Sequence, residues 1–162
     1  MTDRSAEAHP AIIGSPVDWV AALMAQGFDG LARLSGDRNQ VLVAQERYDD
    51  HRTHVDPVIR GADRVELVFA ATRVDRSGRQ DEALIVVTDS MVILSRLFRG
   101  VIGARSITDI FPRPVLAVLP TMIGDCRGVE LYADGRRARL LLHESSAVLE
   151  AALITLSGRD RR

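Results

Sequence analysis

Carboxylates and imidazoles gather in one short stretch of the chain, Asp49-Asp-His-Arg-Thr-His-Val-Asp56. On a helix, His51 and His54 share a face, and Asp50 lies one turn from His54, so a divalent metal ion is geometrically conceivable there. The more ordinary interpretation is a solvated polar helix end in which Asp50 and His54 form an intrahelical pair. We therefore predict that this segment binds no metal ion tightly.

Other side chains narrow the enzymatic chemistry further. All 21 basic residues are arginine, and without lysine the chain can form neither a Walker-type phosphate loop nor a Schiff base. The single cysteine, Cys126, excludes thiolate zinc clusters and CxxC redox chemistry, and a small structural role for it is more ordinary than a reactive thiol beside Arg127. HExxH, GxSxG and GxGxxG motifs are absent, although spacing does not exclude a triad assembled from distant residues. We predict a protein that is not an enzyme and uses no cofactor.

Composition and charge favour an ordinary globular protein. Of the 162 residues 46% are apolar, and apolar runs such as 114–120 are too short to span a bilayer. The first ten residues lack the layout of a signal peptide, and one cysteine cannot form an internal disulfide, so we expect a cytoplasmic location. Residues 1–64 carry 7 arginines against 10 acids, and residues 65–162 carry 14 against 12. This mild asymmetry does not indicate a nucleic-acid binder.

The first part of the chain, residues 1–60, is predicted to be a flexible tail followed by an αα-hairpin. Ser15-Pro16 is a typical helix start, and Asp37 can cap a second helix that stops before Pro57. Gly27 and Gly30 weaken the middle of the first helix and predict a break there. The apolar stripe of this helix, together with Trp19, Phe28 and Leu31, either packs on the rest of the protein, dimerises, or binds a partner.

From Val65 onward the apolar period changes from helical spacing to two, which predicts short strands. The expected strands are residues 65–72, 83–88, 91–95, 101–107, 115–119, 129–133 and 137–142. Asp134-Gly135 is a strong hairpin turn, and Ser145 or Ser146 can cap a final helix that Gly158 ends. We predict an α+β fold in which residues 61–162 fold on their own as a seven-stranded antiparallel β-barrel capped by the C-terminal helix.

Two segments resemble a known family. Ala83-Leu-Ile-Val-Val-Thr-Asp-Ser-Met-Val-Ile-Leu-Ser95, followed by Ile107-Thr-Asp-Ile110, is similar to the bacterial pleckstrin-homology-like (PH-like) domains and the related GRAM domains. The usual run in that family is an apolar strand ending in Thr-Asp, a second apolar strand, a basic hairpin and an Ile-x-x-Ile corner. The resemblance covers about residues 62–157 and implies a PH-like barrel, with the N-terminal helices outside it. Its motifs are mostly structural, so it implies the fold far more than an activity.

In pleckstrin-type folds the loops after strands one, three and six meet at the open end of the barrel, and here these loops are rich in arginine. Planar guanidinium groups suit the recognition of phosphate or carboxylate. Three acids in the first loop, Asp75, Asp81 and Glu82, oppose its arginines, so ordinary solvated loops are the alternative. The candidate ligand- or partner-binding residues are Arg73, Arg76, Arg79, Arg96, Leu97, Phe98, Arg99, Arg136 and Arg137.

These observations favour a non-enzymatic binding module that mediates protein–protein contact or self-association. The alternative is a peripheral module at the inner face of the membrane, which binds anionic lipid headgroups through its basic hairpin loops. Leu97 and Phe98, flanked by Arg96 and Arg99 at an expected hairpin tip, would suit either partner.

Overall fold

The computed structural model describes residues 16–59, 63–100, 103–141, 150, 153 and 154. These residues form two helices followed by seven strands, so the fold class is α+β, as the sequence predicts. The helices are α2 (Pro16–Ser35) and α3 (Arg38–Val55), and a short 3-10 helix, η1 (Arg113–Val115), precedes β5. The strands are β1 (Val65–Val74), β2 (Gln80–Thr88), β3 (Met91–Gly100), β4 (Gly103–Pro112), β5 (Ala117–Ile123), β6 (Cys126–Ala133) and β7 (Arg136–Leu141).

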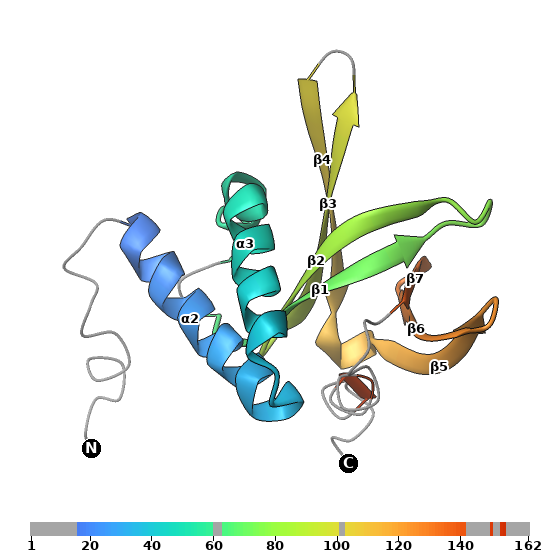
Figure 1. Ribbon diagram of the computed structural model, residues 1–162, viewed down its shortest axis with the longest axis horizontal. Helices are drawn as coiled ribbons and strands as arrows, with labels where there is room; N and C mark the ends of the chain where they lie inside the picture. Colours follow the sequence, from blue (N-terminus) through green and yellow to red (C-terminus); the bar gives the residue numbers. More distant parts are fainter. Residues whose placement is uncertain (1–15, 60–62, 101–102, 142–149, 151–152, 155–162) are drawn as a thin grey trace.

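The seven strands make one antiparallel sheet with the order β4-β3-β2-β1-β7-β6-β5. Strand β1 joins the two halves because it pairs with β2 along most of its length and with β7 at its end. Figure 1 shows the sheet bending at this junction, so that β5, β6 and β7 lie below β1 and β2 in that view. Within the described residues β4 and β5 are unpaired edges. The seven-stranded antiparallel sheet is confirmed, whereas closure into a barrel by strand pairing is not found.

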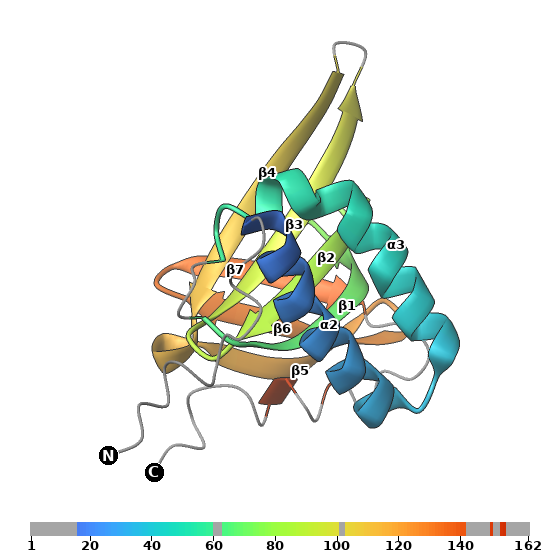
Figure 2. The ribbon, with the colours of Figure 1, turned by 90° about the vertical axis from the view of Figure 1, so that its left-hand side faces the viewer.

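The helices cover one face of β1, β2 and β3, as Figure 2 shows, and the β5–β7 half covers the other. Side chains of both faces are therefore fully buried, among them Val68 and Ile93 on the helix side, and Phe69 and Leu94 on the opposite side. One continuous apolar core joins α2, α3 and both halves of the sheet. The helical extension packs on the sheet, a choice that the sequence left open.

Helix α2 is continuous from Pro16 to Ser35, so the predicted break at Gly27 and Gly30 is wrong. Both glycines face β1, where a Cβ on Gly27 would lie 2.6 Å from Cγ1 of Val65 and a Cβ on Gly30 would overlap the carbonyl oxygen of Glu66. The glycines allow the helix backbone to lie directly against the strand. This close approach, rather than a helix end, is the physical reason for their position.

Two local predictions from turn and cap residues are confirmed. The side chain of Asp37 accepts a hydrogen bond from the backbone amide of Asn39 at 2.9 Å, which caps α3. Asp134 and Gly135 have φ values of 49° and 78°, the pair of positive angles that a two-residue type I′ hairpin requires. This tight turn sets the register of β6 on β7.

Strand β3 continues to Gly100, which corrects the expectation that residues 96–99 form a loop. In the β3–β4 ladder Leu97 lies opposite Ser106 and Arg99 lies opposite Ala104. The two strands form a long ribbon that projects away from the rest of the sheet in both Figure 1 and Figure 2. Residues 96–99 are thus part of a strand, because their pairing with β4 continues beyond the apolar part of β3.

The predicted C-terminal helix lies largely outside the described residues. Of that segment, Leu153 is buried in the core and Glu150 is buried with its carboxylate 3.5 Å from Nη2 of Arg127 in β6. The ion pair places Glu150 beside β6, in the β5–β7 half of the sheet.

Candidate functional site

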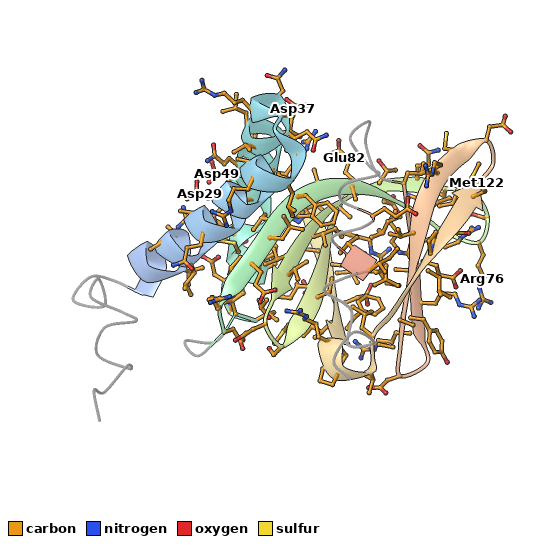
Figure 3. The ribbon with its side chains drawn as sticks, turned by 90° about the horizontal axis from the view of Figure 1, so that it is seen from below. Asp29, Asp37, Asp49, Arg76, Glu82 and Met122 are labelled. Atoms are coloured by element: carbon orange, nitrogen blue, oxygen red, sulfur yellow. The ribbon has the colours of Figure 1, made fainter. Side chains whose placement is uncertain are left out.

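Four arginines line a concave surface where the β1–β2 turn meets the β6–β7 hairpin. We call Arg73, Arg76, Arg137 and Arg139 the arginine groove. All four line a cavity of about 280 Å³. Arg76, Arg137 and Arg139 also line an adjoining cavity of about 340 Å³, together with Glu130. Figure 3 shows Arg76 on the side of the molecule away from the helices.

Strand pairing brings these arginines together from distant parts of the sequence. In the β1–β7 ladder Arg73 lies opposite Leu140 and Val74 lies opposite Arg139. Arg137 and Arg139 are two residues apart on β7, so both project from the same face of the sheet. Leu140 is buried in the core, so Arg73 projects from the core face of the sheet, whereas Arg137 and Arg139 project from the other face. The β1–β7 pairing therefore brings Arg137 and Arg139 next to the β1–β2 turn that carries Arg76.

The groove arginines differ in their partners. Arg139 donates a hydrogen bond of 2.6 Å from Nη2 to the carbonyl oxygen of Asp75, and Arg137 forms an ion pair of 2.7 Å with Glu130. The Arg137 guanidinium also lies 5.8 Å from the ring centre of Tyr132. Among the described residues, Arg73, Arg76 and Arg139 form no ion pair, and Nε of Arg73 is buried without a hydrogen-bond partner. The guanidinium charges of Arg76 and Arg139 thus remain available to an anion, whereas the charge of Arg73 lies near the buried Arg96.

Of the three acids expected to oppose the arginines of the first loop, Asp81 does so by pairing with Arg79, whereas Asp75 and Glu82 bond other groups. The Asp75 carboxylate accepts hydrogen bonds from the hydroxyl and amide of Ser77 and the amide of Arg79, and the Ser77 hydroxyl bond is the largest cause of its lowered pKa. Asp81 lies 3.7 Å from Arg79, and Glu82 forms a 2.7 Å ion pair with Arg47 of α3. Glu82 is therefore directed onto the helix and Asp81 onto Arg79, while Asp75 lines the groove with its carboxylate bonded within the turn.

The remaining candidate residues do not join the groove. Arg96 is buried beside Asp109 at 3.4 Å, and burial followed by the charge of Arg73 lowers its pKa. Arg136 reaches across to the carbonyl oxygen of Ile110 in β4 at 3.5 Å. Arg79 pairs with Asp81 outside the groove. Arg79, Arg96, Arg136 and Leu97 therefore lie outside the groove. The side chains of Phe98 and Arg99 are not among those that the structure describes.

Leu97 lines a different cavity, of about 410 Å³, between α3 and strands β2 and β3. His51 also lines it and is only 2% exposed, which corrects the expectation of a solvated helix end. Nδ1 of His51 lies 2.8 Å from Oγ of Ser95, and burial lowers the pKa of the imidazole. Ser95 is fully buried, so this contact fastens α3 to β3 and offers no accessible nucleophile.

The Asp49–Asp56 segment also forms other pairs than the sequence suggested. Asp50 lies 3.9 Å from Arg47 rather than pairing with His54, and the Tyr48 hydroxyl donates to Asp56 at 2.9 Å. Burial is the main reason that the pKa of Tyr48 lies far above its usual value, and the hydrogen bond to Asp56 raises it further. Within the described part of the chain, no cluster of His, Cys, Asp and Glu side chains has the arrangement of a metal site. Cys126 is exposed at the start of β6.

Arg139 is the groove residue that the sequence prediction missed. The signal was present, because the Asp134-Gly135 turn starts β7 and alternation then puts residues 137 and 139 on one face. What the sequence lacked was the pairing of β7 with β1.

Comparison with known proteins adds no assignment. No protein-family model matches the chain, and no curated protein shows significant sequence similarity to it. Neither described helix has both the length and the apolar character needed to cross a membrane.

Proposed function

We propose that this protein is a non-enzymatic interaction module built on a PH-like barrel, and that its arginine groove binds acidic side chains of a protein partner. The single observation that carries the proposal is the meeting of Arg76 and Arg139 in one groove without ion pairs among the described residues. Guanidinium groups form charge-assisted hydrogen bonds with carboxylates, which are stronger than neutral ones.

The PH-like part of the proposal is supported by strand order and by contacts across the open side. A sheet that begins and ends at β4 and β5 resembles a partly open barrel, and the hydrogen bond from Arg136 of β7 to the carbonyl oxygen of Ile110 in β4 joins its two halves. The burial of Leu153 fits a C-terminal helix that caps the apolar interior. Closure and the helical cap remain part of the proposal.

Apolar side chains beside the groove favour a protein over a small anion. Leu119 and Tyr132 are 44% and 43% exposed on the face of β5 and β6 that also carries Arg137. Tyrosine and arginine are among the residue types most enriched at the energetic centres of protein interfaces. A partner that combines acidic and apolar side chains would contact both parts of this surface.

The test uses a fluorescent synthetic helical peptide that contains glutamate and leucine on one face. Fluorescence anisotropy should show binding to the wild-type chain that weakens as salt rises. Arg76→Glu should reduce the affinity about tenfold, a loss of about 1.4 kcal/mol. Arg79→Glu is the matched control, since it makes the same charge change in the same turn but outside the groove. Equal losses in both variants would contradict the proposal.

A second candidate function is contact with anionic lipid headgroups. The observation that favours it is the projection of the β3–β4 ribbon, which carries the sequence Arg96-Leu-Phe-Arg99. Each arginine near an anionic membrane contributes about 1 kcal/mol, so such attachment would be weak and reversible. The variant Phe98→Ser with Arg99→Glu should then bind phosphatidylserine-containing vesicles about tenfold more weakly than the wild-type chain, as measured by vesicle sedimentation. Vesicle binding that ignores this change would exclude the ribbon.

A further inference from the structure

The outward face of α3 carries acidic and apolar side chains together. Leu42, Glu46 and Asp49 are spaced at one helical turn and so lie on one face, with Val43 beside them. Leu42 is 60% exposed and Val43 is 44% exposed, while Glu46 and Asp49 form no ion pair among the described residues. We call Leu42, Val43, Glu46 and Asp49 the α3 face.

The α3 face is the chemical complement of the arginine groove and its surroundings. The groove offers two arginines without ion pairs, Arg76 and Arg139, beside the exposed Leu119 and Tyr132, whereas the α3 face offers two carboxylates beside two exposed aliphatic side chains. The same asymmetry appears in the whole chain, because residues 1–64 hold 10 acids against 7 arginines and residues 65–162 hold 14 arginines against 12 acids. Opposite charges arranged in this way favour and orient an encounter between two surfaces.

The two surfaces lie on opposite sides of the molecule. Figure 3 shows Asp29, Asp37 and Asp49 on the helices at one side, and Arg76 with Met122 at the other. One copy of the chain therefore cannot bring its own α3 face to its own groove. Two copies can, because the groove of the first would receive the helix of the second.

We propose that the partner of the arginine groove is the α3 face of a second copy of this chain. This inference rests on the proposed function, since it names the protein that the groove binds. The contact joins two different surfaces, so it is heterologous, and repetition produces a ring if the rotation closes or an open chain of copies if it does not. Each copy then uses one groove and one α3 face.

A charge-exchange experiment tests this contact directly. The groove variant is Arg76→Glu with Arg139→Glu, and the helix variant is Glu46→Arg with Asp49→Arg. In sedimentation velocity, the average sedimentation coefficient of the wild-type chain should rise with protein concentration and fall with added salt. Each variant alone should associate at least about tenfold more weakly, since both of its surfaces then carry the same charge.

Mixing the two variants in equal amounts should restore association, because the acidic groove of one faces the basic helix of the other. Arg79→Glu is the control for the single variant Arg76→Glu, because it makes the same charge change in the same turn, and it should associate like the wild-type chain. If the groove variant does not fold, Arg76→Glu alone, at an exposed turn position, replaces it. Failure of the mixture to restore association would overturn the inference.

The outcomes also separate this inference from the proposed function. A wild-type chain that stays monomeric, yet binds the acidic peptide through Arg76, would leave the proposed function standing and refute the second copy as partner. A chain that stays monomeric and ignores the peptide would refute both.

Discussion

The substitution Gly30→Ala tests the contact between α2 and β1, which holds the helical layer on the sheet. An added Cβ would overlap the carbonyl oxygen of Glu66, a backbone atom that no side-chain rotation can move. Carbon and carbonyl oxygen atoms normally approach to about 3.3 Å, so α2 would have to withdraw from β1 by about 1 Å. The buried side chains Met24 and Leu31 of the same helix would lose part of their packing.

Two effects of opposite sign determine the result. Alanine is favoured over glycine inside a helix by about 1 kcal/mol, whereas overpacking of a buried contact costs about 1–3 kcal/mol. We expect the overlap to dominate, with a net loss of up to about 2 kcal/mol in the free energy of unfolding. Urea denaturation followed by circular dichroism measures this as a lower midpoint at unchanged slope.

Two further variants make the result decisive. Ala22→Gly, on the exposed side of α2, measures the helix-propensity effect alone. Gly27→Ala meets side-chain atoms instead, with Cγ2 of Val68 at 2.7 Å, so adding Val68→Ala should recover part of its loss. If Gly30→Ala is as stable as the wild-type chain or more stable, α2 does not lie against the β1 backbone and the reasoning fails.

Three other predictions follow from buried groups. Folding keeps His51 neutral while the unfolded chain binds a proton near pH 6.5, so stability should decline as pH falls below 6.5. That decline should be smaller in His51→Asn, as urea midpoints across pH would show. Arg113 forms an ion pair with Glu66 at 2.8 Å and donates a hydrogen bond to the Thr88 carbonyl oxygen at 2.7 Å. Arg113→Met should therefore lower the free energy of unfolding by roughly 3 kcal/mol, as measured by thermal denaturation. An unchanged stability would contradict the buried pair. Removal of residues 1–60 exposes the helix side of the sheet, so the fragment should show no cooperative unfolding, and a sharp transition would refute the shared core.

The truncation experiment also decides between two predictions. The sequence suggested that residues 61–162 fold on their own, because strands and a terminal helix supply apolar faces. The structure buries Val68 and Ile93 under α2 and α3, in one core with Phe69 and Leu94. We therefore expect the helices to be required for folding.

Local structure could be predicted from the sequence because its causes lie within a few residues. The Asp37 side chain caps the helix that follows it, and Asp134-Gly135 supplies the two positive φ angles of a tight turn. Period-two apolar runs located seven strands in the right order along the chain, although β3 and β4 extend beyond their apolar segments. The ends of these strands are set by their partners, which local sequence does not contain.

The arginine groove shows what only the tertiary structure decided. The sequence by itself determined that arginines are frequent in the β1–β2 and β6–β7 turns, and it determined their spacing along each strand. The pairing of β1 with β7 put Arg139 opposite Val74, next to the turn that carries Arg76, and the packing of α3 on β2 brought Arg47 to Glu82. Which charges meet depends on residues far apart in the chain, because Coulomb attraction and hydrogen bonding act through space. The sequence therefore determined which charged side chains the turns carry, and the fold determined which of them form ion pairs.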